Sequence, residues 1–183
     1  EGDRTLIALL VSQKEPLAVP SMESIDERID NSDHAWRHWT GNLTYEGKYQ
    51  PHVHRSALAL KFLLYSPTGA LAAAPTTSLP EGIGGEKNYD YRYAWIRDAC
   101  LIIRAFAFIG ALAECKAAFS WLTNTILRHE GSLRACYTLD GDIVPDETFL
   151  PLEGYMGSQP VRLGNNAQSQ QQLSMYGDML ETA

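Results

Sequence analysis

The sequence predicts a mainly α-helical fold, in which paired helices form an incomplete ring of two concentric layers after a short N-terminal β and linker segment. Segments 55–65 and 94–109 are apolar on nearly every face, which is typical of helices buried on most sides. Segment 112–128 is amphipathic instead, as expected of an outer helix that covers them. A small single bundle would contain amphipathic helices only. So few helices cannot close the inner layer.

The residues before position 54 are predicted to form a strand and a linker. Residues 5–11 are a short apolar run bounded by polar residues, which predicts a buried strand at the end of a preceding β domain, placed at 1–21. Apolar residues at helical spacing among acidic ones predict a surface helix over 22–39. Because turn formers follow, 22–53 is interpreted as a linker helix and loop. The apolar residues at helical spacing are Ile25, Ile29 and Trp36.

Residues 54–183 are predicted to form the N-terminal part of the helical ring. Loops rich in turn formers are expected over 66–93 and 129–167. On the amphipathic helix, Glu114 lies opposite the expected buried stripe, and a last helix is expected over 168–183. The expected stripe is Leu112, Cys115, Phe119, Leu122 and Ile126, and the apolar face of the last helix is Leu173, Tyr176 and Leu180.

Composition and charge exclude several classes of partner. The formal charge of −7 argues against nucleic acid, which needs a basic face, and no apolar run approaches the ~18 residues of a membrane span. Three cysteines without a C-x-x-C pair predict reduced, buried thiols and a cytoplasmic location: Cys100, Cys115 and Cys136. His52 and His54 lack the further ligands of a zinc site and are interpreted as loop histidines. We expect no metal and no cofactor, and the sequence carries no prediction of oligomeric state.

The densest chemical pattern is the loop-to-helix junction from Asn88 to Asp98. Its aromatic side chains alternate and therefore share one face in an extended segment: Tyr89, Tyr91, Tyr93 and Trp95. Flat rings edged by hydroxyl groups match the apolar faces and equatorial hydroxyls of a pyranose, although an aromatic core cluster would show the same pattern. Asp98 suits the first turn of a helix, whereas the cation Arg97 does not. Neighbouring helical residues point about 100° apart, so the two are not expected to face each other.

A guanidinium and a carboxylate beside an aromatic platform can hold vicinal sugar hydroxyls, and a salt bridge from Arg97 to an outer helix is the alternative. The stretch Tyr91–Asp98 reads Y-R-Y-A-W-I-R-D and resembles the Y-x-Y-x-W-x-R-D signature of glycoside hydrolase family 15, the glucoamylase family, which includes trehalases and glucodextranases. Residues 153–177 resemble its G-Y-x-G-S-x-P-V-R-x-G-N-x-A…Q-x-Q-L…Y-G stretch. Residues 71–81 also resemble the run that precedes the aromatic loop in that family.

The resemblance, over roughly 36–183, implies a six-hairpin (α/α) toroid, commonly preceded by a β-sandwich. It implies that Arg97 and Asp98 bind hydroxyls of a non-reducing-end glucose, in a subsite lined by Tyr91 and Trp95. The substrate would be a glucose-containing oligosaccharide or disaccharide, attacked from its end. Fungal starch enzymes tend to carry a tryptophan near the position of Gln159, and its absence here favours a short substrate such as trehalose.

The family mechanism is inverting hydrolysis by an acidic and a basic glutamate. In relatives both follow the Y-G stretch, so we expect them beyond Ala183 and expect this chain to be an inactive internal piece. The start without methionine and a last helix without a stop signal favour that interpretation. The glutamates outside these motifs are interpreted as solvated loop charges: Glu81, Glu86, Glu130, Glu147 and Glu153. A non-catalytic sugar-sensing toroid or a helical interaction domain are the rival interpretations.

Overall fold

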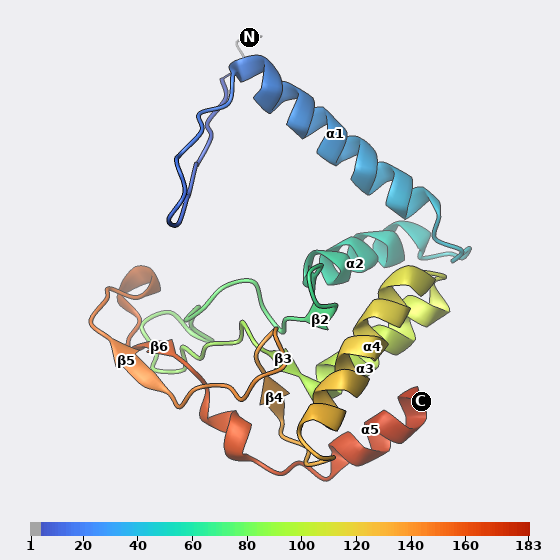
Figure 1. The fold of residues 1–183 in the computed structure, drawn as a ribbon, viewed down its shortest axis with the longest axis vertical. Helices are drawn as coiled ribbons and strands as arrows, with labels where there is room; N and C mark the ends of the chain where they lie inside the picture. Colours follow the sequence, from blue (N-terminus) through green and yellow to red (C-terminus); the bar gives the residue numbers. More distant parts are fainter. Residues whose placement is uncertain (1–4) are drawn as a thin grey trace. The chain divides into compact units, whose positions relative to one another are not determined.

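The computed structural model describes residues 5–183 (Figure 1). The chain divides into two compact units, Glu1–Asn42 and Leu43–Ala183. The division at 42/43 falls inside the segment 22–53 that the sequence predicts as a linker. The N-terminal unit contains α1 (Met22–Gly41), which begins at the N-cap Ser21 and has no buried residue, so the predicted surface helix is confirmed.

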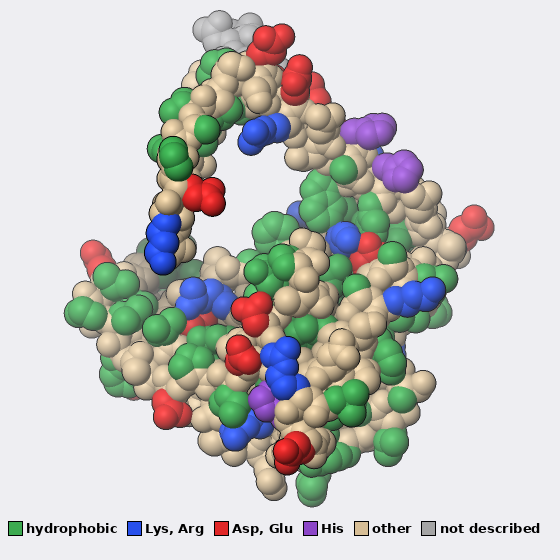
Figure 2. Space-filling view, in the orientation of Figure 1, with side chains coloured by type: hydrophobic (Ala, Val, Ile, Leu, Met, Phe, Trp, Pro, Cys, Tyr) green, Lys and Arg blue, Asp and Glu red, His purple; other side chains and the backbone are tan. Residues whose placement is uncertain are grey.

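The strand predicted over residues 5–11 is not formed. These residues have no regular secondary structure, and Ile7, Leu9 and Val11 are between 84% and 94% exposed. Figure 2 shows hydrophobic side chains at the surface along this segment. A strand needs a neighbour to satisfy its backbone hydrogen bonds, and every strand within the described residues belongs to the other unit. The apolar run alone therefore did not suffice for a strand.

The second unit is mainly helical, with three small antiparallel sheets. Its helices are α2 (Gln50–Phe62), α3 (Ile96–Phe108), α4 (Leu112–Arg128), α5 (Ser174–Thr182) and the short 3₁₀ helices η1 (Tyr155–Gly157) and η2 (Asn166–Ser169). The strand pairs are β1 (Leu64–Tyr65) with β2 (Ala70–Leu71), β3 (Ala94–Trp95) with β4 (Cys136–Tyr137), and β5 (Thr148–Leu150) with β6 (Val161–Leu163). These strands lie in segments predicted mainly as loop, because two or three residues are too few to show alternation.

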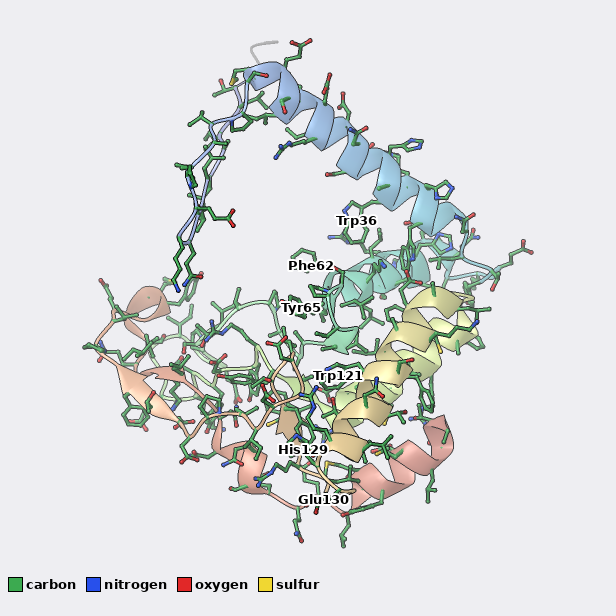
Figure 3. All side chains as sticks on the ribbon, in the orientation of Figure 1. Trp36, Phe62, Tyr65, Trp121, His129 and Glu130 are labelled. Carbon is green, nitrogen blue, oxygen red and sulfur yellow. The ribbon has the colours of Figure 1, made fainter. Side chains whose placement is uncertain are left out.

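The helices pack less completely than the sequence predicts. α3 packs against α4 and α5, which run beside it in Figure 1. One face of α3 is buried, but Leu101 and Phe108 on other faces are more than half exposed. α2 buries only Ala57 and leaves Phe62 exposed (Figure 3). An apolar composition on every face thus overstated how many sides of these two helices are covered within the described chain.

The faces of α4 and α5 that the sequence predicts to be buried are not the faces that the structure buries. Of the stripe predicted on α4, only Leu122 is fully buried, while Leu112 is exposed. Glu114, predicted to face solvent, is buried and its Oε1 accepts a 2.6 Å hydrogen bond from Nζ of Lys61 on α2. α5 starts six residues later than predicted and buries Met175, whereas all three residues of its predicted apolar face are exposed. Ion pairs instead connect α5 to α3, from Arg104 to Asp178 and Glu181.

The C-terminal half of α4 holds the turn that follows β4. Nε1 of Trp121 donates to the carbonyl of Leu139 at 3.1 Å, and the His129 ring lies 2.9 Å from the carbonyl of Gly141 (Figure 3). His129 also stacks on Tyr137, with ring centroids 5.0 Å apart. The short sheet β3–β4 sets where the backbone enters α3.

Candidate functional site: an aromatic and charged cavity

The second unit contains a cavity of about 500 Å³. Two stretches of sequence provide its walls, 89–97 and 147–170. The lining residues are Tyr89, Tyr91, Trp95, Arg97, Glu147, Arg162, Asn165, Asn166, Ala167 and Gln170. The structure therefore brings three of the four predicted substrate-binding residues to one cavity, namely Tyr91, Trp95 and Arg97.

Aromatic rings form one wall of the cavity. Tyr89 and Tyr91 have ring centroids 6.0 Å apart, and Tyr91 meets Trp95 edge-on at 5.6 Å. Tyr93 departs from the predicted shared face and packs against the buried cluster around Trp95 and Cys136. The backbone bends at Tyr93 before pairing begins at Ala94, which breaks the alternation expected of a continuous strand.

Arg97 and Asp98 form an ion pair at the start of α3. Nε of Arg97 lies 3.6 Å from Oδ1 of Asp98, so the flexible arginine turns back onto its neighbour although the two positions diverge on the helix. Burial raises the pKa of the Asp98 carboxyl above its ordinary value, and Arg97 offsets only part of that effect. The alternative considered for Arg97 was a salt bridge to another helix. Within the described chain, the arginine of α3 that pairs with another helix is Arg104, which pairs with acidic residues of α5. Asp98, the fourth predicted substrate-binding residue, is not among the residues that line the cavity; it pairs with Arg97, which lines it.

A second arginine–carboxylate pair lies in the cavity wall. Nε of Arg162 donates to Oε1 of Glu147 at 2.8 Å, and Nη1 donates to the carbonyl of Glu86 at 2.7 Å. The guanidinium also lies over the rings of Tyr89 and Phe149, 4.9 and 5.3 Å from their centroids. The interpretation of Glu147 as a solvated loop charge is wrong, since its side chain is 13% exposed. The other four loop glutamates are exposed.

The buried carboxylate of Asp90 connects the two walls. It accepts two hydrogen bonds of 2.9 Å from the Arg92 side chain and one of 3.3 Å from the backbone N–H of Gly164. Nδ2 of Asn165 donates to the Asp90 carbonyl at 3.0 Å. Burial alone would raise the pKa of Asp90, but the bonds from Arg92 prevail and hold it below its ordinary value.

Two glycines allow backbone segments of the second wall, residues 147–170, to approach neighbouring carbonyl groups closely. Gly164 has φ +84°, and a Cβ there would lie 2.6 Å from the carbonyl oxygen of Pro145 and closer still to that of Asp146. A Cβ on Gly154 would overlap the carbonyl of Ser158. The buried Ser158 hydroxyl accepts a 2.7 Å hydrogen bond from the N–H of Gly84, which connects the glycine-rich loop to this wall.

Amide side chains complete the polar lining. Oδ1 of Asn166 accepts from the backbone N–H of Glu147 at 3.0 Å, and Oδ1 of the buried Asn165 accepts from Ala167 at 2.9 Å. Nη1 of Arg134 donates to Oε1 of Gln168 at 2.7 Å and so holds η2 in place. The cavity therefore combines aromatic faces with charged and amide groups that both donate and accept hydrogen bonds. This is the chemistry that a polyhydroxylated ring requires.

The cysteines and histidines discussed from the sequence do not line the cavity. Cys100 and Cys136 are buried free thiols as predicted, while Cys115 is half-buried. His52 and His54 lie in α2 rather than in a loop. From residue 5 to 183, no cluster of three or more histidine, cysteine or acidic side chains has the arrangement of a metal site. None of the helices described is both long and apolar enough to cross a membrane.

The fold and cavity define a mainly helical protein with a cavity lined by aromatic rings and by side chains that donate and accept hydrogen bonds. The sequence profile of the glycosyl hydrolases family 15 matches residues 47–183, and the chain belongs to this family. The short sheets and helices agree with a helical toroid, and its completion to six hairpins stays a prediction.

Proteins named trehalase are among the relatives. One from Thermoplasma acidophilum is 46% identical over 153 residues, which are 84% of this chain and 26% of that protein. One from Mycolicibacterium smegmatis is 39% identical over 187 residues, covering 100% of this chain and 28% of that protein. The chain spans about a quarter of the length of these curated relatives. No solved structure matches it.

Proposed function

We propose that the intact protein is an exo-acting, inverting α-glucosidase of the trehalase type, and that this chain provides the wall that binds the terminal glucose. The observation that supports the proposal best is the cavity, which Arg97 lines together with the rings of Tyr91 and Trp95. The trehalase names of the relatives and the missing tryptophan at Gln159 favour trehalose over starch.

Each of the four residues has a defined role in this proposal. A pyranose stacks its apolar face on the exposed ring of Tyr91, with the largely buried Trp95 behind that ring. Arg97 donates hydrogen bonds to adjacent hydroxyls, while Asp98 accepts from one hydroxyl and holds the guanidinium in position. Because a carboxylate accepts hydroxyl hydrogen bonds best when it is ionised, the charge of Arg97 next to the partly buried Asp98 favours the binding form.

Neither catalytic carboxylate belongs to this chain in our proposal. Inverting hydrolysis needs two carboxyl groups on opposite sides of the bond, roughly 6.5–9.5 Å apart. Among the described residues that line the cavity, Glu147 is the only acid, and its Oε1 is already bonded to Arg162. We also propose a cytoplasmic location, because the three cysteines are unpaired.

The test compares glucose release by the intact protein and by residues 1–183 alone. We expect the intact protein to hydrolyse trehalose and the 183-residue chain to release no glucose from trehalose or maltose. Arg97→Gln in the intact protein should lower kcat/KM for trehalose by ~10–100-fold, the effect of losing hydrogen bonds from a charged donor. Arg37→Gln removes an exposed arginine paired with Asp33 and is the matched control. Hydrolysis by the 183-residue chain would contradict the placement of the catalytic groups.

A sugar-sensing domain without catalysis is the second candidate, because the described cavity has only one acidic residue in its lining. That candidate predicts that the intact protein binds glucose or trehalose but releases no product. The same assay, combined with equilibrium binding, therefore separates the two.

A further inference from the structure

We propose that Arg162 and Glu147 form a second hydroxyl-binding pair, so that the cavity recognises two sugar units and selects a disaccharide. This inference rests on the proposed function and extends it from the terminal glucose to the unit beyond the scissile bond. Neither residue was among those expected to bind substrate.

The pair is held in a fixed orientation within the cavity wall. Arg162 and Glu147 have side chains that are 11% and 13% exposed. Arg162 lies in β6 opposite Phe149, and Glu147 immediately precedes β5. The guanidinium is held by Glu147, by the Glu86 carbonyl and by the Tyr89 ring. Such anchoring reduces the conformational entropy that a long side chain would lose on binding a ligand.

Hydrogen-bonding capacity remains after the pair has formed. A guanidinium has five N–H donors. The Arg162 side chain uses Nε and one hydrogen of Nη1 for the two bonds described, and among residues 5–183 no acceptor meets Nη2. Oε2 of Glu147 likewise has no side-chain or backbone donor in this range. A pair with unused donors and an unused acceptor, lining a cavity, is suited to vicinal hydroxyls.

The two pairs in the cavity repeat the same chemistry. Arg97, which pairs with Asp98, lines the cavity together with the Tyr91 and Trp95 rings, and Arg162, which pairs with Glu147, lies over the Tyr89 ring. Two clamps, each with an aromatic face, therefore indicate a ligand with two polyhydroxylated rings.

The test measures binding of two probes to the intact protein by calorimetry. The probes are glucose and a trehalose analogue with sulfur in the glycosidic bridge, which resists hydrolysis. The test variant is Arg162→Gln with Glu147→Gln, which keeps the net charge and leaves no buried charge unpaired. Arg37→Gln with Asp33→Asn removes an exposed ion pair and is the control.

We expect the test variant to bind the disaccharide analogue ~10–100-fold more weakly, as for the loss of one or two hydrogen bonds to a charged group, and to bind glucose within about two-fold of the unsubstituted protein. Arg97→Gln should weaken the binding of both probes. Equal losses for the two probes would mean that the pair is only structural, and no loss for either would also overturn the inference. If the unsubstituted protein bound neither probe, the proposed function itself would fail.

Discussion

Replacing Asp90 with alanine tests whether the two cavity walls depend on one buried carboxylate. The change leaves the buried N–H of Gly164 without an acceptor, which costs about 1–3 kcal/mol, and breaks an ion pair whose arginine is half exposed, which adds at most about 1 kcal/mol. We therefore expect the free energy of unfolding to fall by about 1–4 kcal/mol, which lowers Tm by roughly 3–15 °C for a unit of this size.

The assay is urea and thermal unfolding followed by circular dichroism. Because the folded pKa of Asp90 lies below its ordinary value, its contribution to stability is present above the pKa of an unfolded aspartate, about 3.9, and is lost as the pH falls through the folded value. The difference between unsubstituted protein and variant should therefore shrink in acid. Asp33→Ala breaks an exposed ion pair with Arg37 and should leave stability close to that of the unsubstituted protein. A loss for Asp90→Ala no larger than for this control would refute the reasoning.

Three further predictions concern single positions. Gly164→Ala should lower the free energy of unfolding in urea by about 2–4 kcal/mol, because the positive φ and a nearby carbonyl oxygen both disfavour a Cβ. Gly84→Ala, at φ +77° with open space around it, should lower it by only the backbone strain of about 1–2 kcal/mol. Equal losses for the two variants would contradict this reasoning. Glucose binding followed by calorimetry should strengthen as the pH rises through the raised pKa of Asp98, and Asp98→Asn should abolish that dependence. The buried Cys136 thiol, whose pKa burial raises to about 12, should resist iodoacetamide at pH 8 until urea unfolds the protein; rapid labelling of folded protein would show that the thiol is accessible.

The helical elements could be predicted from the sequence because their apolar residues recur over three or more turns. α4 begins and ends at the predicted residues, Leu112 and Arg128. The buried face of α4 could not be predicted, because Glu114 is buried by its partner Lys61, 53 positions earlier in the chain. Periodicity shows that a helix has an apolar face but not which neighbour covers it.

The residues of the candidate site could likewise be predicted only in part. Tyr91, Trp95 and Arg97 could be found because they lie within eight residues of one another and carry a recognisable pattern. Glu147 and Arg162 were missed because their pairing depends on the register of two three-residue strands. The motif stretch from 153 to 177 contained Arg162, and an arginine between two glycine turns could have drawn attention to it.

The most direct test of the account is a crystal structure of the intact protein with glucose bound. We predict a glucose ring against Tyr91 and Trp95, with its hydroxyls within hydrogen-bonding distance of Arg97 and Asp98. A glucose bound elsewhere, with Arg97 and Asp98 making no contact to it, would contradict the assignment of this wall as the sugar-binding site.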